Sequence, residues 1–191
     1  MDSFQQIDLA IFYFLNSDIA NPIFDIVLPF ITNFKNWIPV YLLLIILLAW
    51  KGGAKGRIAV LSMIIAVGLT DYISGEFLKS FFARIRPCHE LIDVRLLINC
   101  GSGKSFPSNH AANNFAMAVV LTHFYKKWTW LFFTLASMVA FSRVYTGVHY
   151  FSDIVGGAIF GTIMALLILQ AARPAENKFL KNSKQPDVNN S

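Results

Sequence analysis

The chain has 191 residues, of which 55% are hydrophobic and only 14% are charged. Soluble globular domains carry roughly 25% charged residues, so this composition favours apolar segments that face lipid over one compact soluble domain. The net charge of +5 comes from basic residues at the ends of apolar runs, which argues against nucleic-acid binding and is typical of membrane proteins.

Residues 1–33 are predicted to form an amphipathic N-terminal segment. Its first part has apolar residues at helical spacing, with Asp8 among the polar residues between them. These apolar residues are Phe4, Ile7, Ile11, Phe14 and Leu15. A second apolar piece, 23–31, is interrupted by Asp25 and Pro29 and is too short to cross a bilayer alone. The segment therefore lies at the membrane interface or, as the alternative, forms one kinked span.

A helix needs about 20 mostly apolar residues to cross ~30 Å of hydrocarbon. Five stretches satisfy or approach this requirement: 36–50, 57–82, 109–125, 128–141 and 151–172. The predicted fold class is an all-α integral membrane protein with five transmembrane helices in one bundle, or six if the N-terminal segment also spans. We expect a single domain over 1–175. The polar stretch 176–191 is predicted to be a disordered cytoplasmic tail.

Basic residues in the connecting segments predict the orientation. Because successive spans cross the membrane in opposite directions, three groups of basic residues lie on the same side. The positive-inside rule makes that side cytoplasmic. These groups are Lys51, Lys55 and Arg57; Lys126 and Lys127; and Arg173, Lys178, Lys181 and Lys184. The long segment 83–108 then lies on the opposite face, with Cys88 and Cys100 in an oxidising compartment. A disulfide and two free thiols both remain open, and no His/Cys spacing there resembles a zinc site.

A first motif, Lys79–Pro87, ends the second predicted span. Lys79 and Arg86 are seven residues apart, which on a helix places both cations on the same side and within reach of one anion. Pro87 then ends or redirects the helix. The structural alternative is a pair of cations that only anchors the helix at the interface.

A second motif, Phe106–His110, opens the third predicted span. Ser108 is a good helix N-cap, and the unpaired N–H groups behind it face the positive end of the helix dipole. Such an N-terminus can bind an anion. The structural alternative is that Ser108 only caps the helix while His110 sits at the interface.

A third motif, Ser142–Asp153, joins the fourth and fifth predicted spans. His149 and Asp153 are four residues apart at the start of a helix, so Asp153 can orient one ring nitrogen and leave the other as a nucleophile. A lone His/Asp pair is often structural. That reading must also explain Arg143 beside it, because a charge at the membrane face is costly.

The three motifs emerge on the same predicted face and together supply three cations, a hydroxyl, helix N–H groups and two histidines. This inventory predicts phosphate transfer: the donors hold the phosphate oxygens, one histidine attacks phosphorus and the other protonates the leaving oxygen.

These motifs resemble the three-part signature of the type 2 phosphatidic acid phosphatase (PAP2) superfamily. The resemblance implies that phosphate is held by the residues Lys79, Arg86, Ser108 and Arg143. It also implies that His149 forms a phosphohistidine, that His110 is the general acid and that Asp153 orients the nucleophile. No metal and no cofactor are implied. Asn109 stands where the family pattern has Gly, and we place it with the phosphate-binding residues, its role left open.

The resemblance implies a lipid phosphatase in the bacterial inner membrane, acting from its outer face on a membrane lipid phosphate, with no protein partner. Lipid A 1-phosphate is the favoured substrate, and undecaprenyl diphosphate and phosphatidylglycerol phosphate are the alternatives. Two other classes remain: a vanadium haloperoxidase-like oxidoreductase, and a lipid-phosphate binder without activity. Glu76 is expected to pair with Lys79 and orient it. His89 and His123 are assigned no role.

Overall fold

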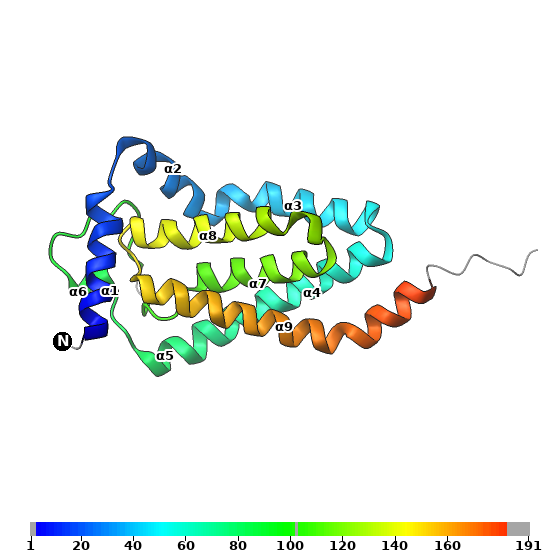
Figure 1. Ribbon diagram of the computed structural model, residues 1–191. Helices are drawn as coiled ribbons and strands as arrows, with labels where there is room; N and C mark the ends of the chain where they lie inside the picture. Colours follow the sequence, from blue (N-terminus) through cyan, green and yellow to red (C-terminus); the bar gives the residue numbers. More distant parts are fainter. Residues whose placement is uncertain (1–2, 102, 183–191) are drawn as a thin grey trace, which may run out of the picture.

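The computed structural model describes residues 3–101 and 103–182, and within that part of the chain all regular structure is helical (Figure 1). The α-helices are α1 (Ser3–Tyr13), α2 (Pro22–Thr32), α3 (Phe34–Lys51), α4 (Gly53–Tyr72), α5 (Lys79–Phe82), α6 (Pro87–Glu90), α7 (Asn109–Phe124), α8 (Thr129–Tyr145) and α9 (Phe151–Asn182). Short π-helical segments cover Phe14–Asp18 and Ile73–Leu78, and a 3-10 turn covers Lys126–Trp128.

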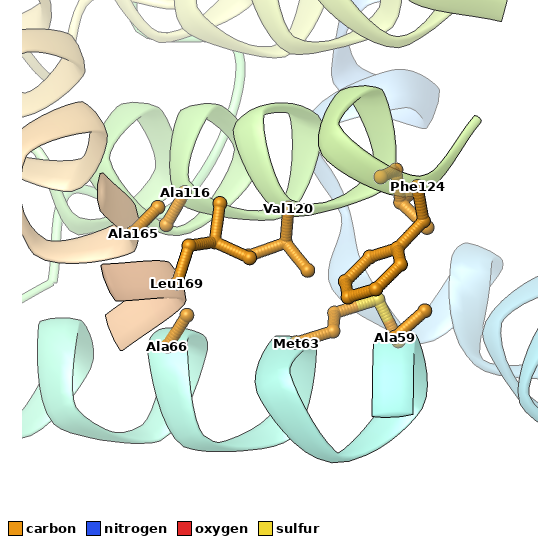
Figure 2. Close-up of a cluster of buried hydrophobic side chains, with 9 residues drawn as sticks. Ala59, Met63, Ala66, Ala116, Val120, Phe124, Ala165 and Leu169 are labelled. Carbon is orange, nitrogen blue, oxygen red and sulfur yellow. The ribbon is translucent and has the colours of Figure 1, made fainter. Parts of the chain in front are cut away.

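Helix α7 is the centre of the bundle. It packs against α4, α8 and α9, while α3 lies alongside α4 (Figure 1). The apolar core between α4, α7 and α9 contains Ala59, Met63, Ala66, Ala116, Val120, Leu121, Phe124, Ala165 and Leu169 (Figure 2). Alanines dominate this list, and small residues let helix backbones approach closely where lipid provides no hydrophobic driving force.

Helices α7 and α9 approach each other closely. A Cβ atom at Gly161 would overlap the backbone of Ala112, and one at Gly157 would overlap the carbonyl of Ser108. Gly157, Gly161 and Ala165 recur every four residues, so they form one stripe along α9. This stripe fixes the start of α7 directly against the start of α9.

Fewer helices can span a membrane than the five or six predicted. Among the described residues, α3, the stretch Gly53–Glu90 and the stretch Phe151–Phe179 are long and apolar enough, and the bent pair α1–α2 gives at most a fourth. The predicted spans 109–125 and 128–141 correspond to α7 and α8, which have 16 and 17 residues. Helices of this length measure about 25 Å, short of the ~30 Å hydrocarbon core.

The N-terminal segment folds as two helices bent by 114° between α1 and α2. Helix α1 crosses the end of the bundle at which α8 ends and α9 begins (Figure 1). It buries Asp8 and Phe12, while Phe4 and Ile7 are 66% and 60% exposed. Both a carboxylate and an aromatic ring of this helix therefore point into the protein, while two of its large apolar side chains point outward.

Helix α9 continues to Asn182, past residue 176 where the disordered tail was predicted to begin. The run Ala175–Lys178 contains good helix formers, which allows the helix to extend beyond the apolar stretch. The remainder of the predicted tail, 183–191, lies outside the described residues.

Candidate active site

The three motifs meet at the end of the bundle that α1 crosses. Arg86 comes from the connection between α5 and α6, and its Nη1 lies 3.3 Å from Nε2 of His149, which precedes α9. The backbone N–H of Ser108, just before α7, donates to the carbonyl of Asp153 over 3.0 Å. The absence of side chains at Gly157 and Gly161 lets α7 and α9 come close enough for this hydrogen bond. Segments separated by more than 40 residues in sequence thus share one site.

His149 has two distinct ring nitrogens. Nδ1 lies 3.2 Å from Oδ2 of Asp153, and because a carboxylate can only accept, Nδ1 carries the proton and Nε2 keeps its lone pair. The ring is 1% exposed, and this burial lowers its pKa to about 4 even though Asp153 favours the charged form. The imidazole is therefore neutral near pH 7, and its unprotonated Nε2 accepts a hydrogen bond from Arg86.

Asp153 is fully buried and has several hydrogen-bond donors. Its Oδ2 accepts from the hydroxyl of Ser105 and, over 2.8 Å, from the backbone N–H of Tyr150. Its Oδ1 accepts from Arg84 over 2.8 Å. These contacts fix the carboxylate in one orientation, which in turn fixes the His149 ring.

Arg86, Arg143 and Ser108 supply donors around His149. Arg86 is held by the carbonyls of Gly103 and Val148 over 3.0 and 3.1 Å. Nη1 of Arg143 donates to Thr32 over 2.6 Å. Its Nε and the hydroxyl of Ser108 are buried without a partner within residues 3–101 and 103–182. Ser108 occupies the N-cap position of α7 without capping it through its side chain. Buried donors are nearly always paired, so two unpaired ones beside a histidine indicate a place for an anionic ligand.

Lys79 and His110 complete the cluster. The charges that act on the His110 ring are those of Arg143, His149, Lys79 and Arg86, so the structure brings the predicted groups together. The expected ion pair between Glu76 and Lys79 is absent from the described residues, and Glu76 is exposed. Glu76 lies in the π-helical segment Ile73–Leu78, whose wider turn moves residues three apart off a common face.

The side chain of Asn109 is held by hydrogen bonds to two neighbouring segments. It donates to Asp71 over 2.9 Å and accepts from the hydroxyl of Ser74 over 2.8 Å. Asn113, one turn further along α7, donates to the same carboxylate. The amide that replaces the family Gly therefore ties α7 to α4 and to the π-helical segment that precedes Lys79.

Cys88 and Cys100 form a disulfide, so the bridged alternative is the one the structure shows. Among the described residues, the one group close enough to hold a metal ion is Cys88, His89 and Cys100, and there the two sulfur atoms are bonded to each other.

Sequence reasoning missed Arg84, Ser105 and Asp8. The signals were present but weak: Arg84 lies between two residues already assigned to the phosphate, and Asp8 is the one charged residue of the helix Ser3–Tyr13. No spacing rule connects either residue with Asp153, because the contacts join segments distant in sequence.

The fold is that of a helical membrane protein, and His149 lies at one end of the bundle beside Asp153 and Arg86. A family model described as the PAP2 superfamily matches residues 56–176, and the chain belongs to that superfamily. The chain is therefore a phosphatase.

Named relatives and solved structures agree with this family. A lipid A 4'-phosphatase of Bacteroides thetaiotaomicron is 32% identical over 170 residues, which are 81% of this chain and 72% of the relative. An undecaprenyl-diphosphatase of Sulfolobus acidocaldarius is 35% identical over 136 residues, which are 70% of this chain and 62% of the relative. The crystal structure of Aquifex aeolicus LpxE superposes with a TM-score of 0.70 at 28% identity, covering 86% of this chain and 95% of that chain.

Proposed function

We propose that this membrane phosphatase removes phosphate from a lipid through a phosphohistidine on His149, without a metal ion or other cofactor. The observation that carries the proposal is a pair of buried donors, Arg143 Nε and Ser108 Oγ, that have no partner among the described residues, together with the unprotonated Nε2 of His149, which faces Arg86. An anion bound there would satisfy both donors and present its phosphorus to the nucleophile.

In the first step, Nε2 of His149 forms a bond to phosphorus while the bond from phosphorus to the lipid oxygen breaks. His110 gives its proton to that oxygen, so the lipid leaves as a neutral alcohol, or as a monophosphate when the substrate is a diphosphate. Asp153 stabilises the positive charge on the ring through Nδ1. In the second step, water attacks phosphorus while the now neutral His110 takes a proton from it, the P–N bond breaks, its electron pair returns to Nε2 and inorganic phosphate is released.

Lys79, Arg86 and Arg143 are assigned to the phosphate oxygens, together with Ser108 and the backbone N–H groups at the start of α7. Cations and preorganised donors are the main source of stabilisation in phosphoryl transfer, where charge is spread over the equatorial oxygens. Asn109 contributes through its backbone position at the helix start, since its side chain is bonded to Asp71 and Ser74.

An apolar pocket supports a lipid as the substrate. It lies between α3, α7 and α8, and its walls include Trp37, Met117 and Leu135. Asn114 also lines the pocket and donates to the carbonyl of His110 over 2.9 Å, so the pocket begins one helical turn from the proposed general acid. A hydrocarbon chain in the pocket would place its headgroup at the site.

Among lipid phosphates we favour the 1-phosphate of lipid A. The name of the Bacteroides relative supports lipid A as the lipid, although that name specifies the 4'-phosphate. Undecaprenyl diphosphate is the second candidate, supported by the name of the Sulfolobus relative, and phosphatidylglycerol phosphate is the third. We place the enzyme in the bacterial inner membrane, with one domain over 1–175 and its site on the outer face.

The test offers these three lipids side by side to purified protein in EDTA and compares kcat/KM. Phosphate release that persists in EDTA is expected, with the largest kcat/KM for the lipid A 1-phosphate. Release that stops on chelation and returns with a divalent metal would contradict the metal-free mechanism. Binding of all three lipids without any release would contradict the enzymatic proposal itself.

A further inference from the structure

Helix α1 reaches the candidate active site through Asp8. This carboxylate is 3% exposed and accepts hydrogen bonds from the backbone N–H of Ser152 over 2.8 Å and from the Ser152 hydroxyl over 2.5 Å. It also forms an ion pair with Arg84, whose Nη2 lies 2.7 Å away. A buried carboxylate in an apolar helix is costly unless it serves a partner, and here its partners lie beside the nucleophile.

Arg84 connects Asp8 with Asp153. Its Nη1 donates to Oδ1 of Asp153 over 2.8 Å and to the hydroxyl of Ser152 over 2.6 Å, while Nη2 donates to Asp8. The guanidinium also lies over the ring of Tyr150, with 3.9 Å from Cζ to the ring centroid. A planar guanidinium held at both ends and on one face has a fixed orientation.

We propose that Asp8, acting through Arg84, is a positioning residue for Asp153 and His149, so that the N-terminal helix is part of the catalytic apparatus. The inference rests on the proposed role of His149 as the nucleophile. Arg84 occupies Oδ1 of Asp153, which leaves Oδ2 to face Nδ1 of His149. Asp8 holds Arg84 in that place and prevents it from turning toward the phosphate.

A second ion pair at the same end of the molecule provides a matched control. Arg95 and Asp25 lie 2.8 Å apart, and like the first pair they join the N-terminal segment to the long connection before α7. Asp25 also accepts from the hydroxyl of Tyr145 over 2.6 Å. Within the described part of the chain, neither member of this pair bonds to Asp153 or His149. Removing the pair therefore tests the effect of weaker docking of the N-terminal segment alone.

The experiment compares Asp8→Asn, Asp8→Glu and Arg84→Lys with Asp25→Asn in purified full-length protein. Kinetics with the preferred lipid phosphate give kcat and KM, and thermal unfolding in detergent reports folding. Asp8→Asn is expected to lower kcat by about 10- to 100-fold, because a misplacement near 1 Å has effects of that size. The KM should stay within about twofold, since Lys79, Arg86 and Arg143 are untouched. Adding Asp8→Asn to Arg84→Lys should lower kcat little further, as for residues that act as one unit.

Asp8→Glu keeps the charge and the anchor of α1 but lengthens the side chain, so it should fold and still lose several-fold in kcat. Wild-type kcat in both folded Asp8 variants would overturn the proposal, and so would an equal loss of kcat in Asp25→Asn. If Asp8→Asn does not fold, the result for Asp8→Glu decides. The variant His149→Ala distinguishes failure of the positioning role from failure of the proposed function. If His149→Ala is inactive while both Asp8 variants are fully active, only the positioning role is contradicted.

Discussion

At His149, one ring nitrogen is hydrogen-bonded to Asp153, and the other carries a lone pair that faces Arg86. We expect His149→Ala to abolish phosphate release while the protein remains folded, because no other nucleophile takes this place in the described site. The matched control is His89→Ala, since His89 is exposed and bonds the carbonyl of Gly101. Phosphate release by the His149 variant at more than about a thousandth of the normal rate would contradict the mechanism.

The pKa of His149 predicts the pH dependence. Burial lowers that pKa to about 4, and the attacking form is the neutral ring, so the rate should hold as pH falls from 7 and decline only as it approaches 4. The measurement is the rate of phosphoenzyme formation by rapid quench across this range. A decline centred near 6.5, the ordinary value for histidine, would contradict the burial argument.

A control for this profile uses two substrates whose phosphate groups have different pKa values. An acid limb that belongs to His149 stays at the same pH with both substrates. A limb that moves with the substrate belongs to the phosphate and carries no information on the enzyme.

Neutralising a phosphate-binding cation should be costly. We expect Arg86→Gln and Arg143→Gln each to lower kcat/KM by at least tenfold, because one donor to a developing oxyanion contributes ~3 kcal/mol. Arg57→Gln is the control, since Arg57 bonds the carbonyl of Gly53 at the start of α4 and is exposed. Equal losses in all three variants would indicate a general effect of charge and not a site.

Sequence spacing predicts some contacts between the residues of the site but not others. The contact between His149 and Asp153 follows from a separation of four residues at a helix start. The phosphate-binding roles of Arg86, Ser108 and Arg143 stay predictions. Ser105 and Arg84 escaped because they reach Asp153 from other segments, 48 and 69 residues away. A sequence pattern carries local periodicity, whereas such contacts depend on how helices pack.

At the scale of elements, the α7–α9 contact positions two parts of the site relative to each other. Gly161→Leu should lower the unfolding temperature and the activity together, because any Cβ there overlaps the backbone of Ala112. Overpacking costs typically 1–3 kcal/mol, and a clash with backbone belongs at the upper end. Gly68→Ala is the control, since a Cβ at Gly68 meets nothing within 4 Å. Thermal unfolding in detergent measures the stability of both variants. Equal unfolding temperatures for Gly161→Leu and Gly68→Ala would contradict the close-packing argument.

Helix existence was more predictable than the number of spans. Apolar runs correctly located α3, α4 and α9, because their hydrophobicity is continuous. The π-helical segment Ile73–Leu78 and the inward direction of Asp8 were not predictable, since both are set by tertiary partners. In α7, the half-buried side chains of Asn113 and Asn114 bond to Asp71 and to the carbonyl of His110. Hydropathy alone predicted a membrane-spanning helix here and did not indicate these contacts.

At the scale of the whole molecule, the orientation in the membrane is a prediction from basic residues. In a background with Cys88→Ser and Cys100→Ser, we expect an impermeant maleimide to label Lys104→Cys in sealed right-side-out vesicles. Lys126→Cys, at the other end of α7, should be labelled only after the vesicles are opened. Both positions are exposed, so access and not burial decides the result. The reverse pattern would overturn the proposed topology.

The contact between Asp8 and Ser152 spans 144 residues of sequence and therefore has a consequence for biosynthesis. The ribosome completes α1 long before it makes the start of α9, so Asp8 lacks its two hydrogen bonds from Ser152 during most of translation. Because an unpaired carboxylate is costly in hydrocarbon, α1 should wait at the membrane surface and dock last. A nascent chain that stops before residue 151 should accordingly leave α1 open to protease, whereas the finished chain protects it. The protein would then become an active phosphatase only after the start of α9 has been made and α1 has docked.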